Sequence, residues 1–492
     1  PRPGKRDRPR RDARAALVVV GVLAAVALGA IAVAVVMAGQ AQEARAHLVA
    51  ARSAAEGVAD AVRAQDPDRV RALADEASRH VHQAQDIVEG PLWQAASPLP
   101  LVGPNVAAVR TMTRAAVVVD ERALPAGLRI MTDLSSGALS TDGAGVALQP
   151  LRSAQEDLPA ITAAVGEADE MLTSIDTTTV VPDLAAAASG LRTLLGDLRP
   201  ALEDAQRTLP VLLGMAGGEG PRSYLVVFQN SAETRATGGN PSAMTVLNVD
   251  DGRAAIDTQA DSTTFYDAGL VGRDVTDVPA QTRALYESDT WQFPQNYTRT
   301  PDFPLTAHLF DVLWTRATGQ QIDGVISLDP TALSRVLARG DWAPVPMIDA
   351  LSQGVREHRV LAWMRDAQAQ STVVDAGMAG TFSADGDDLG VFVNDSSHSK
   401  LEYYLSSAVD VVCDPGQATA RASITLTSTA PEGGLSGYVQ GHRNPSMGLP
   451  GSTMLLDVLA FAPAGARLQS VDPASGDAPR WDRAGSDAGR DA

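Results

Sequence analysis

Residues 15–39, AALVVVGVLAAVALGAIAVAVVMAG, form an apolar run without a charged or strongly polar side chain. As a helix this run is about 37 Å long, enough to cross a bilayer with some tilt. Residues 1–14 carry a net charge of +5, with seven basic side chains against two aspartates (Arg2, Lys5, Arg6, Arg8, Arg10, Arg11 and Arg14 against Asp7 and Asp12). The positive-inside rule therefore predicts a single-pass signal anchor in the cell membrane, with a cytoplasmic N-terminus and an extracytoplasmic C-terminus. The alternative is a cleaved signal peptide, although the run is longer than a usual h-region.

The part of the chain after the apolar run is strongly acidic. The whole chain has a net charge of −19, and leaving out the basic tail of +5 gives −24. Such a charge excludes nucleic acid and anionic lipid surfaces as nonspecific partners. The one cysteine, Cys413, excludes an internal disulfide framework, so stability must come from ordinary hydrophobic cores. A length of 492 residues allows two or three domains.

Residues 41–215 have the apolar periodicity of helices. Asp66 and Pro67 are an N-cap and a first helical residue, and apolar side chains then recur every three or four positions up to Val88. Further helices are predicted at 106–119, 151–172 and 191–202, separated by breaks at 91–105, 135–145 and 177–183. No heptad pattern persists long enough for an extended coiled coil. The sequence therefore predicts a helical bundle or stalk near the membrane.

The period changes to that of strands after residue 218. Strands are predicted at 223–228, 242–249, 253–256 and 322–328, with a hairpin turn at 250–252 between the second and the third. Helices are predicted at 304–319, ending in Gly319, and at 329–340, capped by Asp329. Alternating strands and helices favour an α/β domain over residues 218–412. Later strands at 389–394, 401–412, 421–430 and 454–463 predict a β-rich portion over 413–468, and the polar residues 469–492 predict a disordered tail. The fold class of the whole chain is α+β.

The segment QNSAETRATGG, residues 229–239, follows a predicted strand at the end where open α/β sheets bind ligands. It combines neutral hydrogen-bonding groups, an acid, a cation and two glycines (Asn230, Glu233, Arg235, Thr237, Gly238 and Gly239). The guanidinium of Arg235 suits phosphate or carboxylate, and the glycines let backbone amides approach a ligand. Alternatively, Arg235 pairs with Glu233 or a nearby acid and the glycines serve only a turn. Residue chemistry alone leaves both interpretations open.

Most catalytic motifs are absent from the sequence. There is no P-loop, GxGxxG, HExxH or GxSxG pattern. Ser397 and Lys400 have the S-x-x-K spacing of penicillin-binding proteins, but the companion KTG motif is missing. His80 and His82 are two residues apart and point to different sides of a helix, so we expect exposed polar residues and no metal site there.

Four stretches together resemble the uncharacterised bacterial membrane-protein family called domain of unknown function 4012. They are residues 91–105, 222–239, 301–337 and 394–405. The resemblance implies a single-pass envelope protein of mainly Gram-positive, especially actinobacterial, origin, and it implies no activity. It marks twelve residues without giving any of them a role (Asn230, Glu233, Arg235, Thr237, Gly238, Gly239, Asp302, Pro304, Asp323, Gly324, Asp329 and Lys400). After Pro346 a helical stretch usual in the family is missing, which puts one side of any pocket in doubt.

Residues 320–340 are more loosely similar to a segment of the LytR-CpsA-Psr proteins. That similarity implies phosphotransferases that attach glycopolymers from polyprenyl pyrophosphate carriers to the wall, usually with a divalent metal. Under it, Arg235 would bind pyrophosphate and Asp302 or Asp323 would hold the metal. The S-x-P-R-D stretch of those proteins is absent here. A structural role as helix cap or turn former is therefore the preferred interpretation of both acids.

Two hypotheses of function follow. The first is an envelope protein that binds or organises a wall polymer, a lipid-linked sugar or a protein partner. The second is a phosphotransferase of the LytR-CpsA-Psr type. The sequence leaves open whether the chain is an enzyme and names no cofactor. Lys400, the one lysine outside the basic tail, is either an ordinary surface charge or a ligand-binding residue in the same cleft as Arg235.

Overall fold

The computed structural model describes residues 9–64, 66–100, 102–135, 145–337, 351–381, 389–441 and 448–463, with short pieces after residue 464. Contacts divide the chain into two compact units. The first, here called the helical unit, comprises Pro1–Leu139 and Gln149–Pro210; the second, the sheet unit, comprises Ser140–Leu148 and Val211–Ala492. The predicted change from helical to strand periodicity after residue 218 lies eight residues beyond the division at Pro210. The segment after Pro346 that departs from the family pattern begins outside the described residues.

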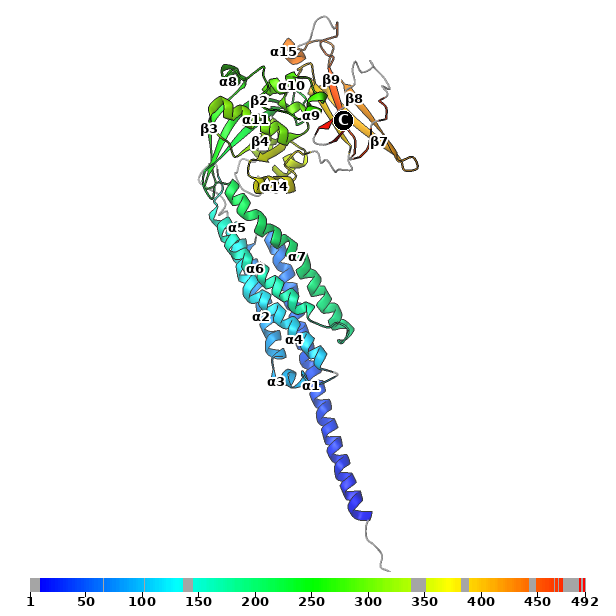
Figure 1. The fold of residues 1–492 in the computed structure, drawn as a ribbon. Helices are drawn as coiled ribbons and strands as arrows, with labels where there is room; N and C mark the ends of the chain where they lie inside the picture. Colours follow the sequence, from blue (N-terminus) through cyan, green and yellow to red (C-terminus); the bar gives the residue numbers. More distant parts are fainter. Residues whose placement is uncertain are drawn as a thin grey trace, which may run out of the picture. The chain divides into compact units, whose positions relative to one another are not determined.

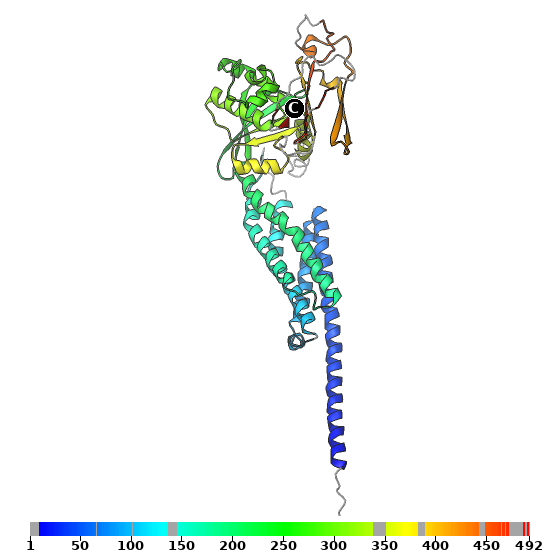
Figure 2. The same ribbon diagram turned by 45° about the vertical axis from the view of Figure 1, so that its right-hand side comes forward.

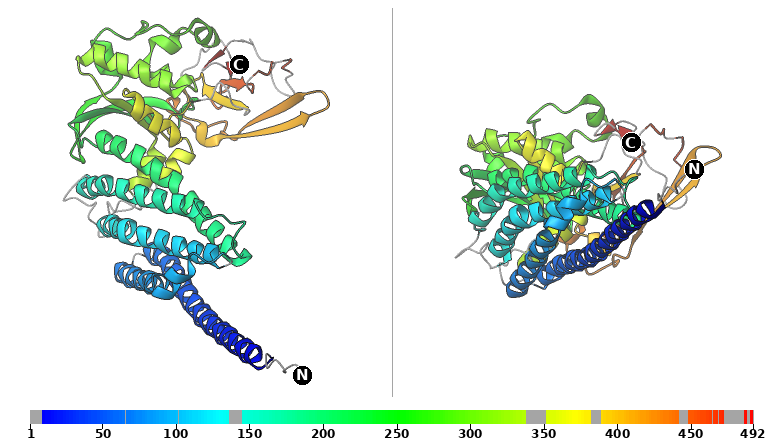
Figure 3. Two further views of the ribbon diagram at one scale, coloured as in Figure 1. Left: turned by 60° about the horizontal axis from the view of Figure 1, so that its bottom comes forward. Right: turned by 90° about the horizontal axis from the view of Figure 1, so that it is seen from below.

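The helical unit consists mainly of long helices that run alongside one another (Figures 1 and 3). The described helices are α1 (Pro9–Arg63), α2 (Pro67–Val88), α3 (Pro91–Ala96), α4 (Gly103–Val118), α5 (Leu124–Ser135), α6 (Gln149–Thr173) and α7 (Pro182–Met215). A π-helical turn, η1 (Val119–Ala123), joins α4 to α5. Small apolar side chains fill the interior, the largest cluster being Met112, Ala115, Val165, Ala168, Leu172, Ala188 and Leu195. The sequence predicts helices over residues 41–215, and the described helices α1 to α7 lie within residues 9–215.

Helix α2 begins and ends where the sequence predicts. Asp66 Oδ1 accepts a hydrogen bond from the backbone N–H of Arg69 at 3.0 Å, and Pro67 is the first helical residue. The predicted helix 106–119 is too short, because α4, η1 and α5 continue as one run to Ser135. The predicted break 91–105 contains the short helix α3, since a proline at the first position favours a helix start.

The predicted membrane-spanning residues 15–39 lie in α1. Most of them fall outside the residues whose side chains the structure describes, which begin at residue 32. Among the residues that are described, no helix is both long and apolar enough to cross a membrane. The anchor stays a prediction.

The prediction that His80 and His82 are simple exposed residues was wrong. His82 Nε2 lies 3.3 Å from Oδ2 of Asp120, a buried residue of the π-helical turn. His80 lies against His47 of α1, with the two Nδ1 atoms 3.0 Å apart. Because residues two apart on a helix point in different directions, each histidine meets a different partner helix.

A five-stranded mixed sheet forms the centre of the sheet unit, with strand order β3-β2-β1-β4-β5. Its strands are β1 (Arg222–Asn230), β2 (Asn240–Asp250), β3 (Arg253–Ala260), β4 (Gly324–Leu328) and β5 (Val360–Met364). Among the described strands only β1 and β4 pair in parallel, from Tyr224 opposite Gly324 to Phe228 opposite Leu328. The predicted α/β alternation is therefore present, but in a sheet whose other pairs are antiparallel.

Helices cover both faces of this sheet. On one face, Leu225 and Val227 of β1 pack in the core that contains α11 (Phe303–Thr318). On the other face, Tyr224 packs with α14 (Ala367–Asp375) and with the end of α7. Alternate residues of β1 thus serve opposite cores, as expected for a central strand buried on both sides. Gly319 ends α11 in a left-handed conformation, φ 74°, as the sequence predicts.

The remaining described helices are short. In the sheet unit they are α8 (Ser262–Asp267), α9 (Ala280–Leu285), α10 (Asp289–Gln292), η2 (Pro294–Arg299), α12 (Pro330–Leu337), η3 (Glu402–Tyr404) and α15 (Gly437–Gln440). Asp329 caps α12 as predicted, since its Oδ1 accepts a hydrogen bond from the N–H of Ala332 at 2.7 Å. The last residues of the predicted helix 329–340 lie outside the described part of the chain.

The strands near the C-terminus form separate two-stranded sheets. β6 (Gly390–Asp395) pairs with β9 (Leu456–Phe461), and β7 (Leu405–Asp414) pairs with β8 (Thr419–Ser428). The β7–β8 hairpin projects from the sheet unit in the views of Figures 2 and 3. The predicted boundary between residues 412 and 413 falls inside β7.

Part of the predicted disordered tail has secondary structure. The short strands β10 (Ser486–Asp487) and β11 (Arg490–Asp491) pair with each other, with Asp487 opposite Arg490.

Candidate functional site

The loop that follows β1 holds six of the predicted site residues. Asn230, the last residue of β1, accepts a hydrogen bond from the N–H of Ala232 through its side chain at 3.2 Å. A Cβ atom on Gly239 would lie 2.4 Å from the carbonyl oxygen of Asn230, so only glycine fits there. Gly238 has φ 128°, a conformation that favours glycine. The two glycines thus fold the loop back onto the end of its own strand.

Arg235 is buried, with 3% of its surface exposed. Its Nη1 donates to the carbonyl oxygens of Thr234 and Asp395, at 2.8 and 2.9 Å. Its Nη2 lies 3.2 Å from Nδ1 of His398, which therefore accepts. Burial and the nearby charge of Arg299 lower the pKa of Arg235 to about 10. Most of the guanidinium is consequently engaged with the chain itself and turned away from solvent.

His398 is held as a neutral acceptor for that guanidinium. Burial, followed by the charges of Arg235 and Arg299, lowers its pKa below the usual value for histidine. Its backbone has φ 50°, a left-handed conformation that is uncommon outside glycine. The segment that carries His398 is therefore tightly bent toward the loop after β1.

Asp395 organises that bent segment, and sequence reasoning missed it. It is fully buried. Its carboxylate accepts hydrogen bonds from the backbone N–H groups of Ser397 and Ser399 at 2.7 and 3.0 Å, and from both serine hydroxyls. An aspartate followed by serines two and four residues later is a signal of this local arrangement, because short polar side chains bond the backbone around them.

The carboxylate of Glu233 is also paired inside the chain. It is buried, and it accepts from Nδ2 of Asn240 and pairs with Nζ of Lys400. The same Nζ lies 4.2 Å from the ring centroid of Tyr438, a cation–π geometry. Lys400 thus faces the loop of Arg235, but as the ionic partner of Glu233.

A third segment completes this arrangement. Thr237 donates to the carbonyl oxygen of Thr298 through its N–H at 3.2 Å, and Oγ1 of Thr298 donates to the carbonyl oxygen of Gly239 at 2.8 Å. Asn394 accepts from the N–H of Ala236 at 3.0 Å and donates to the carbonyl oxygen of Arg299. We call the three segments, residues 233–240, 296–299 and 394–400, the interlock.

The Ser397 and Lys400 pair is not a nucleophile and its base. The hydroxyl of Ser397 donates to Asp395, whereas Lys400 pairs with Glu233. The S-x-x-K spacing therefore reflects two structural contacts of the interlock.

The structure does not bring Asp323 to Arg235. Asp323 precedes β4 and bonds Arg222 and the N–H of Ser223 at the start of β1, at 3.1 and 2.8 Å. Asp323 lies where the parallel strands β1 and β4 begin, and the loop that holds Arg235 follows the end of β1. The two are therefore about 20 Å apart along the strands. A single pyrophosphate and metal site using both residues is thus excluded by the geometry.

Asp302 lies at the N-cap position of α11, followed by Pro304 in the first turn. Its backbone N–H donates to Oγ1 of Thr300, and its carbonyl oxygen accepts from the N–H of Thr306. In the described residues, no three acidic, cysteine or histidine side chains gather as a group that could hold a metal ion.

A family comparison covers the centre of the sheet unit. Residues 219–367 match the model of a family described as a protein of unknown function, DUF4012. The chain therefore contains a DUF4012 domain. No curated protein and no solved structure matches the chain. The match spans less of the chain than the resemblance suggested, since it includes neither residues 91–105 nor residues 394–405.

The interlock joins the DUF4012 segment to residues outside the match. Glu233 and Arg235 lie within it, whereas Asp395, His398 and Lys400 lie beyond residue 367. The partners of the central charged residues are thus supplied by a later part of the chain, which explains why the motif after β1 gave no hint of them.

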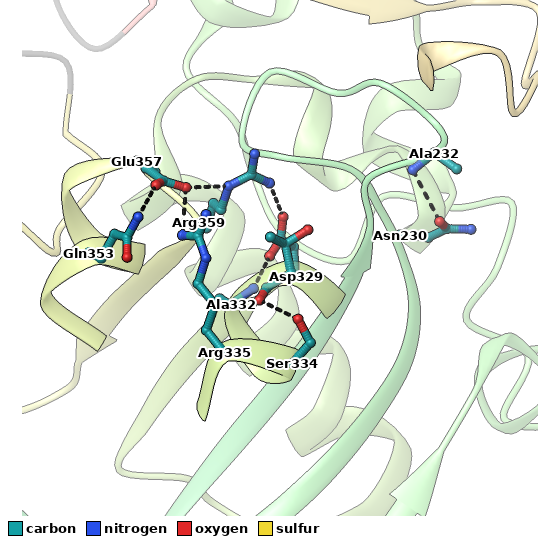
Figure 4. A network of polar contacts seen from close by, with 10 residues as sticks. Asn230, Ala232, Asp329, Ala332, Ser334, Arg335, Gln353, Glu357 and Arg359 are labelled. Atoms are coloured by element: carbon teal, nitrogen blue, oxygen red, sulfur yellow. Dashed lines mark hydrogen bonds and ion pairs between the residues drawn. The ribbon is translucent and has the colours of Figure 1, made fainter. Parts of the chain in front are cut away.

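A second polar network lies at the same edge of the DUF4012 sheet, where β1 and β4 end (Figure 4). Arg359 bonds both Asp329 and Glu357, and Arg335 bonds Glu357 at 2.8 Å. The hydrogen bonds from Arg335 and Arg359 lower the pKa of Glu357 to about 2. Burial raises the pKa of the nearby Glu402 to about 7, against the opposing charge of Arg359. Sequence reasoning identified only Asp329 here, as a helix cap.

Proposed function

We propose that this chain is a membrane-anchored, extracytoplasmic scaffold of the cell envelope whose sheet unit binds a protein partner. The basic tail and the apolar residues 15–39 support the anchor and its orientation. The observation that carries the binding role is the β7–β8 hairpin, which presents an uncovered apolar surface.

The two faces of the hairpin differ in chemistry. Residues opposite one another in an antiparallel pair share a face. One face, here called the apolar face, carries no charge (Leu405, Ser407, Val409, Val411 and Cys413 opposite Ser428, Leu426, Ile424, Ala422 and Ala420). The other face is mostly polar and includes Asp410, Arg421 and the exposed Val412.

The apolar face is open to solvent. Val409 and Val411 are 43% and 50% exposed. Among the described elements, no other helix or strand packs extensively on β7 or β8. A two-stranded hairpin is marginally stable alone, and an uncharged apolar strip that remains exposed is typical of a surface that a protein covers. A phosphate ligand would instead require a cationic group, and this strip carries no charge.

The interlock supports binding over phosphoryl transfer. The guanidinium of Arg235 and the carboxylate of Glu233 are buried and bonded inside the chain, and Asp323 lies at the other edge of the sheet. The groups that a LytR-CpsA-Psr-type mechanism would use to hold pyrophosphate and metal are thus engaged structurally or kept apart.

Site-specific photo-crosslinking in the native membrane tests the proposal. A photoreactive residue at position 411 should give a discrete protein adduct, whereas the same residue at position 412, on the opposite face of the same strand, should not. Val409→Asp should abolish the adduct at 411, because a charge would be buried in the contact. Equal labelling from both positions, or no adduct from either, would contradict a protein partner on this face.

The other ligands are tested by the lipids that copurify with the protein. Mass spectrometry of wild type and Arg235→Ala should show no polyprenyl phosphate or lipid-linked sugar that depends on Arg235. A polyprenyl species present in wild type and lost in the variant would instead support the transferase hypothesis. A wall polymer retained through the apolar face would appear in the crosslinking experiment as a carbohydrate adduct at position 411.

A further inference from the structure

A histidine pair joins the first two helices of the helical unit. His47 of α1 and His80 of α2 lie 33 residues apart in the chain, and their Nδ1 atoms face each other at 3.0 Å. The rings are tilted by 34° with centroids 5.3 Å apart. Oε1 of Gln83, one turn along α2, lies 3.2 Å from the same Nδ1 of His80. Nδ1 of His80 therefore has a potential metal ligand from each of the two helices within 3.2 Å.

Hydrogen bonds alone leave one of these contacts poorly satisfied. A neutral imidazole nitrogen carries either one proton or one lone pair. If Nδ1 of His80 donates its proton to Gln83, it has no lone pair to accept from His47. If it accepts from His47, it has no proton to donate to Gln83. The two short contacts of His80 Nδ1 thus compete for its single proton or lone pair.

A metal ion satisfies both contacts at once. Tetrahedral zinc with bonds of about 2.0–2.1 Å places neighbouring ligand atoms about 3.3–3.4 Å apart. The observed separations of 3.0 and 3.2 Å are within a few tenths of an ångström of that value. Neutral imidazole is a preferred zinc ligand, and the amide oxygen of Gln83 is a weaker oxygen ligand.

We propose that His47 and His80, assisted by Gln83, form a zinc site that clamps α1 to α2. Nδ1 of each histidine binds the ion while Nε2 carries the ring proton. Water completes the coordination, since all three side chains are at least partly exposed. The site is separate from the interlock, the hairpin and the proposed binding function, and it stabilises the pairing of the two helices.

Calorimetric titration of the full-length protein with Zn²⁺ tests this site. The protein is kept in detergent, stripped with a chelator and purified without a polyhistidine tag. Wild type should bind one equivalent of zinc. His47→Asn and His80→Asn should each weaken binding at least tenfold. His82→Asn is the matched control, because that histidine lies on the same helix but pairs with Asp120, and it should bind as wild type does.

A gain-of-affinity variant guards against loss of folding. Gln83→Glu replaces a neutral amide oxygen with a carboxylate and should tighten zinc binding several-fold, which an unfolded variant would not do. With Co²⁺ in place of zinc, wild type should show the visible absorption of a tetrahedral ion. Zinc binding that survives both histidine substitutions, a wild type that binds no zinc, or a Gln83→Glu variant that binds no tighter would overturn the site.

Discussion

The interlock and the β7–β8 hairpin are neighbours in the chain and opposite in character. Residues 394–400 bury charges and hydroxyls, whereas residues 405–414 expose valines. Folded chains usually do the reverse, so both regions require an explanation. The buried polar groups of the interlock find most of their partners within the chain, whereas no described helix or strand packs extensively on the hairpin. We therefore expect the first region to stabilise the fold, and the second is the surface for which we propose a protein partner.

The largest loss of stability is expected from removing the carboxylate of Asp395. Asp395→Ala should lower the free energy of unfolding of the sheet unit by about 3–5 kcal/mol, because four donors lose their acceptor in a buried environment. Urea unfolding followed by tryptophan fluorescence measures it, since only Trp93 of the six tryptophans precedes residue 211. Asp410→Ala on the exposed hairpin is the control and should change it by less than about 0.5 kcal/mol. A cost below about 1 kcal/mol for Asp395→Ala would show that the interlock does not stabilise the fold.

A smaller effect is expected from closing the space at Gly239. Gly239→Ala places a methyl group against the carbonyl oxygen of Asn230 and should cost about 2–4 kcal/mol, since backbone must move. Gly433→Ala is the matched control, because a Cβ there would meet no atom within 4 Å. It should be neutral within about 0.5 kcal/mol in the same urea titration. Equal stabilities of the two variants would mean that the loop relaxes freely and is available to a ligand.

Local signals predicted much of the fold. The cap at Asp66, the glycine at the end of α11 and the turn at residues 250–252 each act within a few residues, and each lies where the sequence indicates. The single parallel pairing of β1 with β4 could not be predicted in this way. It depends on contacts between residues about 100 positions apart.

The candidate site also depends on contacts between residues far apart in the chain. Residue types identified Arg235 and Glu233 as candidate site residues. They did not show whether these side chains face a ligand or pair with other residues of the chain. The answer depends on Asp395, His398 and Lys400, which contact the loop although they lie some 160 residues later in the chain. The histidine pair of the helical unit was missed for a similar reason, because only the register of α1 against α2 brings His47 to His80.

Glu402, at the junction of the two regions, should make the free energy of unfolding depend on pH. It lies between Lys400 of the interlock and Leu405 at the start of the hairpin. Its pKa is raised to about 7 in the folded protein, so between about pH 4.5 and 7 the folded state binds more protons than the unfolded state. Stability should therefore fall as the pH rises through this window, by about 1–3 kcal/mol after allowance for partial solvation.

Urea unfolding at pH 5 and pH 8 measures this contribution. Glu402→Gln mimics the protonated form and should remove that part of the pH dependence. Glu432→Gln, an exposed site, should retain the slope of wild type. If wild type and Glu402→Gln have the same slope, the carboxyl of Glu402 is well solvated and the junction is open to water.

The smallest effect on stability is expected from a substitution on the apolar face of the hairpin. Val411→Ser should change the free energy of unfolding by less than about 0.5 kcal/mol, because the side chain is already half exposed at 50%. Val226→Ser, a valine buried in the central strand β1, should cost about 2–4 kcal/mol in the same experiment, since it leaves a cavity and a buried hydroxyl. A cost above about 1 kcal/mol for Val411→Ser would mean that another part of the chain covers the apolar face. The hairpin would then belong to the core, and the distinction between a stabilising interlock and a recognition surface would no longer hold.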